Sequence, residues 1–139
     1  MYKLALQIAT KAHKGQVRKD GITPYIKHPI RVADKFNDDF KKTIAILHDV
    51  LEDTDQDLSM FPQEVLSVLD VLTKKDNYFT YIDNISKNDI AREIKIADIK
   101  DNLSDTCFQL SPSQIKRYNK ALTILTRKDN RYEHKKKNL

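Results

Sequence analysis

The stretch Ile44-Ala45-Ile46-Leu47-His48-Asp49-Val50-Leu51-Glu52-Asp53 is amphipathic at helical spacing, and the fold prediction starts from it. At about 100° per residue, one arc of such a helix is apolar and the opposite arc carries every ionisable group. The polar arc holds one histidine and three acids, with no basic residue among them. A solvated helix face normally mixes charges of both signs. The pattern therefore predicts a helix that binds a cation, with a solvated acidic face as the alternative. The apolar arc consists of Ile44, Ile46, Leu47, Val50 and Leu51.

Helical spacing of apolar residues also dominates the rest of the chain, which predicts an all-α bundle. The only two glycines, Gly15 and Gly21, bracket one short loop, and no Asn-Gly or Asp-Gly pair joins alternating strands. Proline in a first turn and Ser or Asn at an N-cap mark helix starts. We expect a first helix with Leu4, Ala5, Ile8, Ala9 and Ala12 on its apolar face, ending near Gly15; a helix from Pro29 through Val32 and Phe36; one opened by Pro62; one over Tyr78–Lys87; one capped by Asn88; and a last one opened by the capping box Ser111–Gln114.

Length and composition predict one domain. The chain has 139 residues, and we expect one folded domain over residues 1–128 and a basic tail over residues 129–139. Its single cysteine, Cys107, cannot form an internal disulfide. No stretch approaches the roughly 18 apolar residues of a membrane span, and the N-terminus lacks a signal-peptide pattern. We therefore expect a cytoplasmic protein that does not enter membranes.

The charges are unevenly distributed along the chain. Residues 36–115 carry sixteen acidic and eight basic residues, whereas residues 11–35 carry seven basic and two acidic ones, and residues 116–139 nine and two. This partition suits a site in which acids hold a metal while Lys and Arg hold phosphates. Aromatic residues do not interleave with the basic ones, so a nucleic acid is not the expected partner.

The adjacent pair His48 and Asp49 is the strongest candidate for a metal site. It offers one imidazole nitrogen and one carboxylate oxygen, a combination that suits Mn²⁺ and similar ions. Glu52 and Asp53 follow about one turn later, where they could take protons from a water at the ion. This arrangement predicts a hydrolase.

Three other segments each permit two interpretations: part of a functional site, or an ordinary structural residue or loop. His28 lies beside Pro29, and a lone histidine is most often an ordinary, partly buried side chain. Asp98 by itself is expected to be exposed. The loop that contains Arg18 and Lys19 is either a phosphate-binding segment or a polar surface loop.

Taken together, three blocks of this sequence resemble the HD-domain hydrolases of the RelA/SpoT type. The first runs from His13 to Pro29, the second is His48 to Thr54, and the third is Lys95-Ile96-Ala97-Asp98. The blocks occur in the order of that family and extend from residue 13 to about residue 102. The first two are highly specific together, and the third is looser.

The resemblance implies a single-domain HD-type bundle that hydrolyses the 3′-pyrophosphate of guanosine alarmones, (p)ppGpp, with one Mn²⁺ or a similar divalent ion. It also implies a small member without a synthetase domain. By position, the resemblance assigns metal binding to His28, His48, Asp49 and Asp98, activation of water to Glu52 and Asp53, the nucleotide pocket near the base to Arg18 and Lys19, and the ribose or phosphate side to Asn102.

The third block departs from the family. Asp98 is followed by Ile99-Lys100-Asp101-Asn102, where the family usually has Arg-Leu-His-Asn. Two alternatives therefore stay open. One is an HD phosphohydrolase of another nucleotide, such as a nucleoside monophosphate or a nicotinamide dinucleotide phosphate. The other is a non-catalytic module that binds nucleic acid or protein through its basic ends, although a pure binder would not need Glu52 and Asp53.

Overall fold

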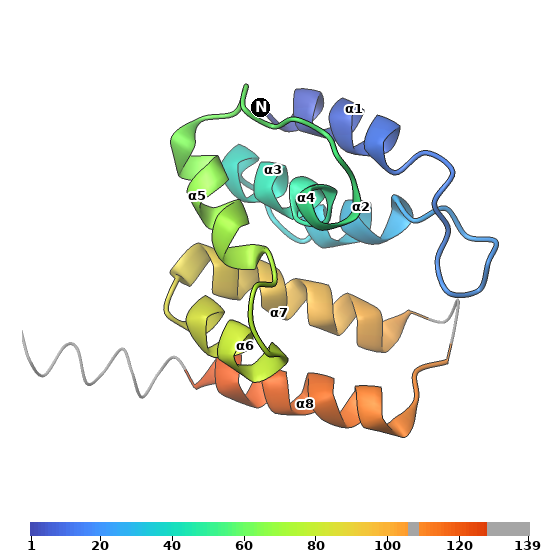
Figure 1. The fold of residues 1–139 in the computed structure, drawn as a ribbon, viewed down its shortest axis with the longest axis vertical. Helices are drawn as coiled ribbons and strands as arrows, with labels where there is room; N and C mark the ends of the chain where they lie inside the picture. The colour runs from blue at the N-terminus through green and yellow to red at the C-terminus, as the bar shows by residue number, and fades with distance from the viewer. Residues whose placement is uncertain (106–108, 128–139) are drawn as a thin grey trace, which may run out of the picture.

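The computed structural model describes residues 1–105 and 109–127, and this part of the chain is a bundle of helices (Figure 1). The all-α prediction is confirmed. An isolated antiparallel bridge joins Val17 and Pro24 in the loop after the first helix. The helices are α1 (Tyr2–Ala12), α2 (Lys27–Ala33), α3 (Asp39–Leu47), α4 (Val50–Asp53), α5 (Gln63–Leu72), α6 (Tyr78–Ser86), α7 (Asp89–Ser104) and α8 (Pro112–Thr126).

Helix α7 is the central element of the bundle. It runs through the middle of the molecule, with α1 to α4 on one side and α6 and α8 on the other (Figure 1). It packs against α2, α3 and α5 as well as against α6 and α8. Ile94 and Ile99 of α7 are completely buried, and each contributes roughly 1.5–3 kcal/mol through burial of its side chain. The polar residues of α7 therefore have fixed positions inside the bundle.

Four of the eight helices in the described residues begin at a residue whose side chain caps the helix. The Asn88 side chain accepts a hydrogen bond from the backbone N–H of Ala91, and Ser111 forms a reciprocal capping box with Gln114. Pro62 lies at the N-cap of α5, as expected. The residues at these three helix starts were therefore enough to predict where the helices begin, because capping is a local interaction.

The helix predicted from Pro29 differs from the structure in its extent, and the predicted first helix differs in which of its apolar residues are buried. Helix α2 begins at Lys27, with Pro29 inside its first turn, and it ends before Phe36. In α1, Ala5 and Ala9 are buried as predicted, but Leu4 remains 47% exposed. The small side chains of the alanines let α1 pack closely, and α1 packs mainly on α3.

The single helix predicted over residues 44–53 is interrupted. Helix α3 ends at Leu47, and α4 begins at Val50. Asp49, between them, has φ −97° and ψ −7°, which departs from ideal helical geometry. As a result, Leu51 is 40% exposed instead of lying in the core.

Every helix within residues 1–105 and 109–127 is too short or too polar to cross a membrane. The expected domain boundary at residue 128 and the basic tail over residues 129–139 lie outside the described residues.

Candidate metal centre

Four side chains from three separate segments converge between α2, α7 and the α3–α4 junction. His28, His48, Asp49 and Asp98 each contribute one nitrogen or oxygen atom, and these atoms all lie within 4.8 Å of one another. His28, His48 and Asp98 are no more than 5% exposed. The structure thus brings together the four residues that were assigned to the metal, including Asp98, which by itself was expected to be exposed.

The break in the helix brings the His48 and Asp49 side chains together. In a continuous helix they would point about 100° apart, whereas here His48 Nε2 lies 3.1 Å from Asp49 Oδ2. The backbone carbonyl of Ala45 accepts a hydrogen bond from His48 Nδ1 at 2.5 Å. Because a carbonyl can only accept, Nδ1 carries a proton and Nε2 faces the cluster.

His28 joins the same cluster from α2. Its Nε2 lies 2.7 Å from Oδ1 of Asp98, and its Nδ1 lies 2.6 Å from Oδ2 of Asp101. Oδ1 of Asp98 also lies 3.3 Å from His48 Nε2. One carboxylate oxygen therefore faces both imidazole rings.

Electrostatics favour protons on the histidines and negative charge on the acids. Burial alone would lower the pKa of His28, but its hydrogen bonds with Asp101 and Asp98 outweigh burial and raise it. For His48, the charges of Asp49 and Asp98 likewise outweigh burial and raise the pKa well above its usual value. Burial would raise the pKa of Asp98, but Lys95 and His48 hold it well below its usual value. A divalent cation would suit these carboxylates in place of the histidine protons.

Two residues to which no role in the site had been assigned hold the acids in place. The Tyr25 hydroxyl donates to Oδ2 of Asp49 at 2.6 Å, and Lys95 Nζ lies 3.0 Å from Oδ2 of Asp98. Tyr25 carried no separate signal, although it lies within the first block of the resemblance. Lys95 lies three residues before Asp98, and that helical spacing is a signal that could have identified it.

The two acids assigned to water activation occupy different surroundings. Glu52 and Asp53 are both exposed, at the end of α4. Oε1 of Glu52 accepts a hydrogen bond from the backbone N–H of Lys74 at 2.6 Å. Partial burial, followed by the charges of Asp49 and Glu52, raises the pKa of Asp53. Gln16 donates to the backbone carbonyl of Asp53 at 3.4 Å and so links the Gly15–Gly21 loop to α4.

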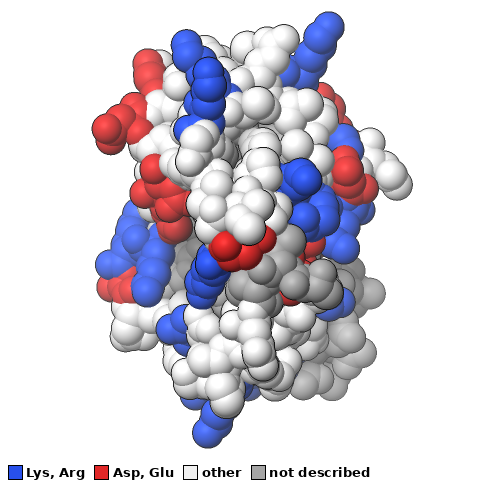
Figure 2. All heavy atoms as spheres, turned by 90° about the vertical axis from the view of Figure 1, so that its right-hand side faces the viewer, with Lys and Arg blue, Asp and Glu red and all other residues white. Residues whose placement is uncertain are grey.

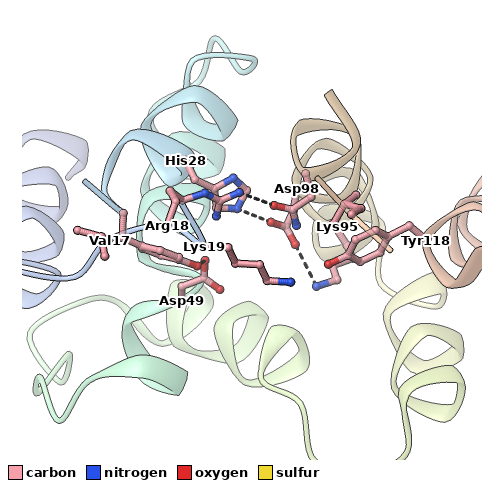
Figure 3. A pocket seen from close by; sticks show the side chains of 11 residues that line it. Val17, Arg18, Lys19, His28, Asp49, Lys95, Asp98 and Tyr118 are labelled. Atoms are coloured by element: carbon pink, nitrogen blue, oxygen red, sulfur yellow. Dashed lines mark hydrogen bonds and ion pairs between the residues drawn. The ribbon is translucent and has the colours of Figure 1, made fainter. Parts of the chain in front are cut away.

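A pocket of about 290 Å³ opens beside the cluster. In Figure 3, Lys19 and Lys95 extend toward its middle from opposite sides. The three residues assigned to the substrate, Arg18, Lys19 and Asn102, all line this pocket. Its other lining residues in the described part of the chain are Val17, Tyr25, His28, Asp49, Lys95, Asp98, Leu110 and Tyr118, and they do not include Glu52 or Asp53.

Arg18 belongs to the pocket wall and is only 8% exposed. Its Nη2 donates to Asn102 Oδ1 and to Asp105 Oδ2, both at 3.1 Å. Because of these contacts, Arg18 is not part of a free surface loop.

On the face of the molecule shown in Figure 2, acidic and basic side chains lie interspersed.

Comparisons with known proteins agree with this geometry. No family model matches the chain. A guanosine-3′,5′-bis(diphosphate) 3′-pyrophosphohydrolase of Borreliella burgdorferi is 50% identical over 78 residues, which are 50% of this chain and 12% of that protein. A guanosine-3′,5′-bis(diphosphate) 3′-pyrophosphohydrolase of Drosophila melanogaster is 34% identical over 118 residues, which are 72% of this chain and 66% of that protein. The chain thus spans less than two thirds of either relative.

A solved structure agrees in fold as well. It is described as a metazoan orthologue of SpoT that hydrolyzes ppGpp and plays a role in starvation responses. The match has a TM-score of 0.74 at 28% identity and covers 89% of this chain and 82% of the other.

The helical fold and the buried His/Asp cluster are those of an HD-type domain. More specifically, the chain is homologous to the guanosine-3′,5′-bis(diphosphate) 3′-pyrophosphohydrolases. The resemblance noted in the sequence is therefore confirmed.

Proposed function

We propose that this protein hydrolyses the 3′-pyrophosphate of (p)ppGpp with Mn²⁺, giving GDP or GTP and pyrophosphate. The observation that carries the proposal is the buried cluster of two histidines and two aspartates beside a pocket lined by basic residues. The names of the homologous proteins supply the substrate class. Such a nucleotide would be met in the cytoplasm, where we expect the protein to act.

The donor atoms fit a divalent transition metal. Two imidazole nitrogens and two carboxylate oxygens form a mixed set that suits Mn²⁺ better than Mg²⁺ or a thiolate-seeking ion. We infer that His28, His48, Asp49 and Asp98 hold one such ion. When bound, it supplies a Lewis acid that lowers the pKa of water and offsets charge on phosphate oxygens.

We propose that Asp53 or Glu52 receives the proton of the attacking water. A base works best when its pKa lies near the working pH, and the raised pKa of Asp53 moves that group in the required direction. The water oxygen forms a bond to the 3′-linked phosphorus, while the bond from that phosphorus to the ribose 3′-oxygen breaks. The 3′-oxygen takes up a proton, and pyrophosphate leaves.

Basic residues offset the charge of the substrate. A 3′-pyrophosphate adds several negative charges, which the acidic cluster alone would repel. Arg18 is held in the pocket wall, and Lys19 and Lys95 reach toward its middle (Figure 3). We propose that Arg18 and Lys19 contact the nucleotide on the base side, and that Asn102 contacts the ribose or phosphate side.

A substrate panel tests this function. Purified protein with Mn²⁺ is incubated with ppGpp, with NADPH and with GMP, and pyrophosphate and phosphate are measured separately. We expect ppGpp to give GDP and pyrophosphate in equal amounts, and the His48→Ala variant to give neither. Release of single phosphate from NADPH, with ppGpp untouched, would replace this proposal by hydrolysis of a nicotinamide dinucleotide phosphate.

A further inference from the structure

Asp101 is a buried acid in contact with the metal cluster but outside the four-residue set. It is 4% exposed and lies three residues after Asp98, on the same side of α7. Its Oδ2 accepts a hydrogen bond from His28 Nδ1 at 2.6 Å. The other ring nitrogen, Nε2, is thereby directed at Asp98 and the cluster. Asp101 thus contacts the side of the ring that faces away from the metal position.

Arg31 fixes the Asp101 carboxylate. Its Nε donates to Oδ1 at 2.8 Å, and its Nη2 donates to Oδ2 at 3.0 Å, so the guanidinium binds both oxygens. A two-point contact of this kind sets the plane of the carboxylate. Arg31 Nη2 is itself held by Asp105 Oδ2 at 2.8 Å. Asp101 is therefore a rigid, negatively charged acceptor.

The two histidines of the cluster differ in the group that accepts the hydrogen bond from Nδ1. His48 donates from Nδ1 to the neutral carbonyl of Ala45, whereas His28 donates from Nδ1 to a carboxylate. An outer carboxylate fixes the tautomer and orientation of a ligating imidazole and raises its basicity. Asp101 also stands at the position where the resembled family usually has histidine.

We propose that Asp101 is a positioning residue of the metal site, which holds the His28 ring with Nε2 toward the ion. This inference rests on the proposed metal site and adds a specific outer residue to it. Loss of such an outer partner typically weakens metal binding by about 10–100-fold.

Binding of Mn²⁺ to the whole chain, followed by the electron paramagnetic resonance of the free ion, measures this effect without any substrate. We expect Asp101→Ala to bind Mn²⁺ about 10–100-fold more weakly than the wild type. Asp101→Asn, which keeps the size but lacks the charge, should also bind more weakly, and Asp101→Glu should recover part of the loss. Asp89→Asn is the matched control. It makes the same chemical change on the same helix, at a side chain that is 88% exposed, and it should bind like the wild type.

A second readout separates positioning from a general loss of structure. In the Zn²⁺-loaded wild type, a hydrogen-bonded Nδ1–H proton of His28 should give a strongly downfield proton resonance, assigned by its absence in His28→Asn. Asp101→Ala should lose this resonance while its circular dichroism stays native.

The outcomes are distinguishable. Wild-type affinity in Asp101→Ala overturns the inference and leaves the metal site standing. If Asp101→Ala does not fold, wild-type affinity in folded Asp101→Asn overturns it equally. A wild type that binds no Mn²⁺ at all overturns the proposed function itself.

Discussion

Glu52 and Asp53 are neighbours in the chain, but their side chains have different tasks in the structure. Glu52 anchors the segment after α5, because its Oε1 accepts a hydrogen bond from the backbone N–H of Lys74. Partial burial, followed by the negative charge of Asp49, raises the pKa of Asp53. Any test of the proton acceptor must therefore separate the anchoring contact from the chemistry.

Glu52→Gln makes this separation. The amide oxygen of Gln can still accept from Lys74, so the anchoring contact survives, but the amide cannot take a proton. We expect the variant to fold, to bind Mn²⁺ like the wild type, and to hydrolyse ppGpp about 10²–10⁴-fold more slowly, the usual contribution of a general base. Turnover is measured at saturating ppGpp and Mn²⁺.

Asp53→Asn is the companion variant, with the same expectation for turnover and metal. Because its pKa is raised, the acid limb of the wild-type rate should lie above the ordinary aspartate range near pH 4. Near-normal turnover in Glu52→Gln with a large loss in Asp53→Asn would make Asp53 the base and leave Glu52 an anchor. Near-normal turnover in both would contradict the proposed mechanism.

At the scale of the elements, the helix break at His48 and Asp49 shows what local pattern could not reveal. Residues 44–53 have continuous helical spacing and no Gly or Pro, so the sequence predicted one helix. The actual ending of α3 at Leu47 brings both side chains to one cluster and turns Leu51 outward. Contacts with distant segments, which no local pattern encodes, determine this geometry.

Helix α7 shows the same division between local and distant signals. Asn88 predicted its start correctly because capping is a local interaction. The burial of Asp98 was predictable only from the resemblance, since its partner His28 lies 70 residues away. Asp101 and Arg31 were missed for the same reason: their pairing also joins residues that are 70 positions apart.

The cap of α7 can be tested on its own. Asn88→Ala removes the side-chain acceptor for Ala91 N–H and should lower the free energy of unfolding by about 1 kcal/mol, as N-cap losses usually do. Urea unfolding measures the change. Asn77→Ala, which removes the corresponding cap of α6, is the matched control and should cost a similar amount.

Mn²⁺ affinity should stay at the wild-type level in both cap variants, because Asp98 lies about ten residues beyond the start of α7. A selective loss of metal affinity in Asn88→Ala would show that the helix start, rather than the packed middle of α7, sets the position of the ligand.

At the scale of the whole molecule, metal binding and stability should be linked through pH. His28 and His48 have raised pKa values in the folded, metal-free protein, against about 6.5 in an unfolded chain. Their protonation therefore stabilises the metal-free fold fully below about pH 6.5, and this contribution is lost as the pH rises through the folded values. Bound Mn²⁺ requires neutral imidazole rings with no proton on Nε2, so the stabilising effect of the ion should grow over the same pH range.

Thermal unfolding between about pH 6 and pH 9 measures this linkage. With a chelator present, Tm should fall as the pH rises, whereas the increase in Tm on adding Mn²⁺ should become larger. His48→Ala should show a flatter profile and a smaller response to the ion. A chelated wild type whose Tm rises steadily over this range would contradict the placement of the two protonated histidines.

The central claim is that the buried cluster holds the ion on which hydrolysis depends. The most direct test measures bound Mn²⁺ and ppGpp turnover together, in the wild type and in folded His48→Ala. We predict about one Mn²⁺ per wild-type chain, and the loss of both metal and pyrophosphate release in the variant. Full metal occupancy in His48→Ala, with turnover unchanged, would contradict the account.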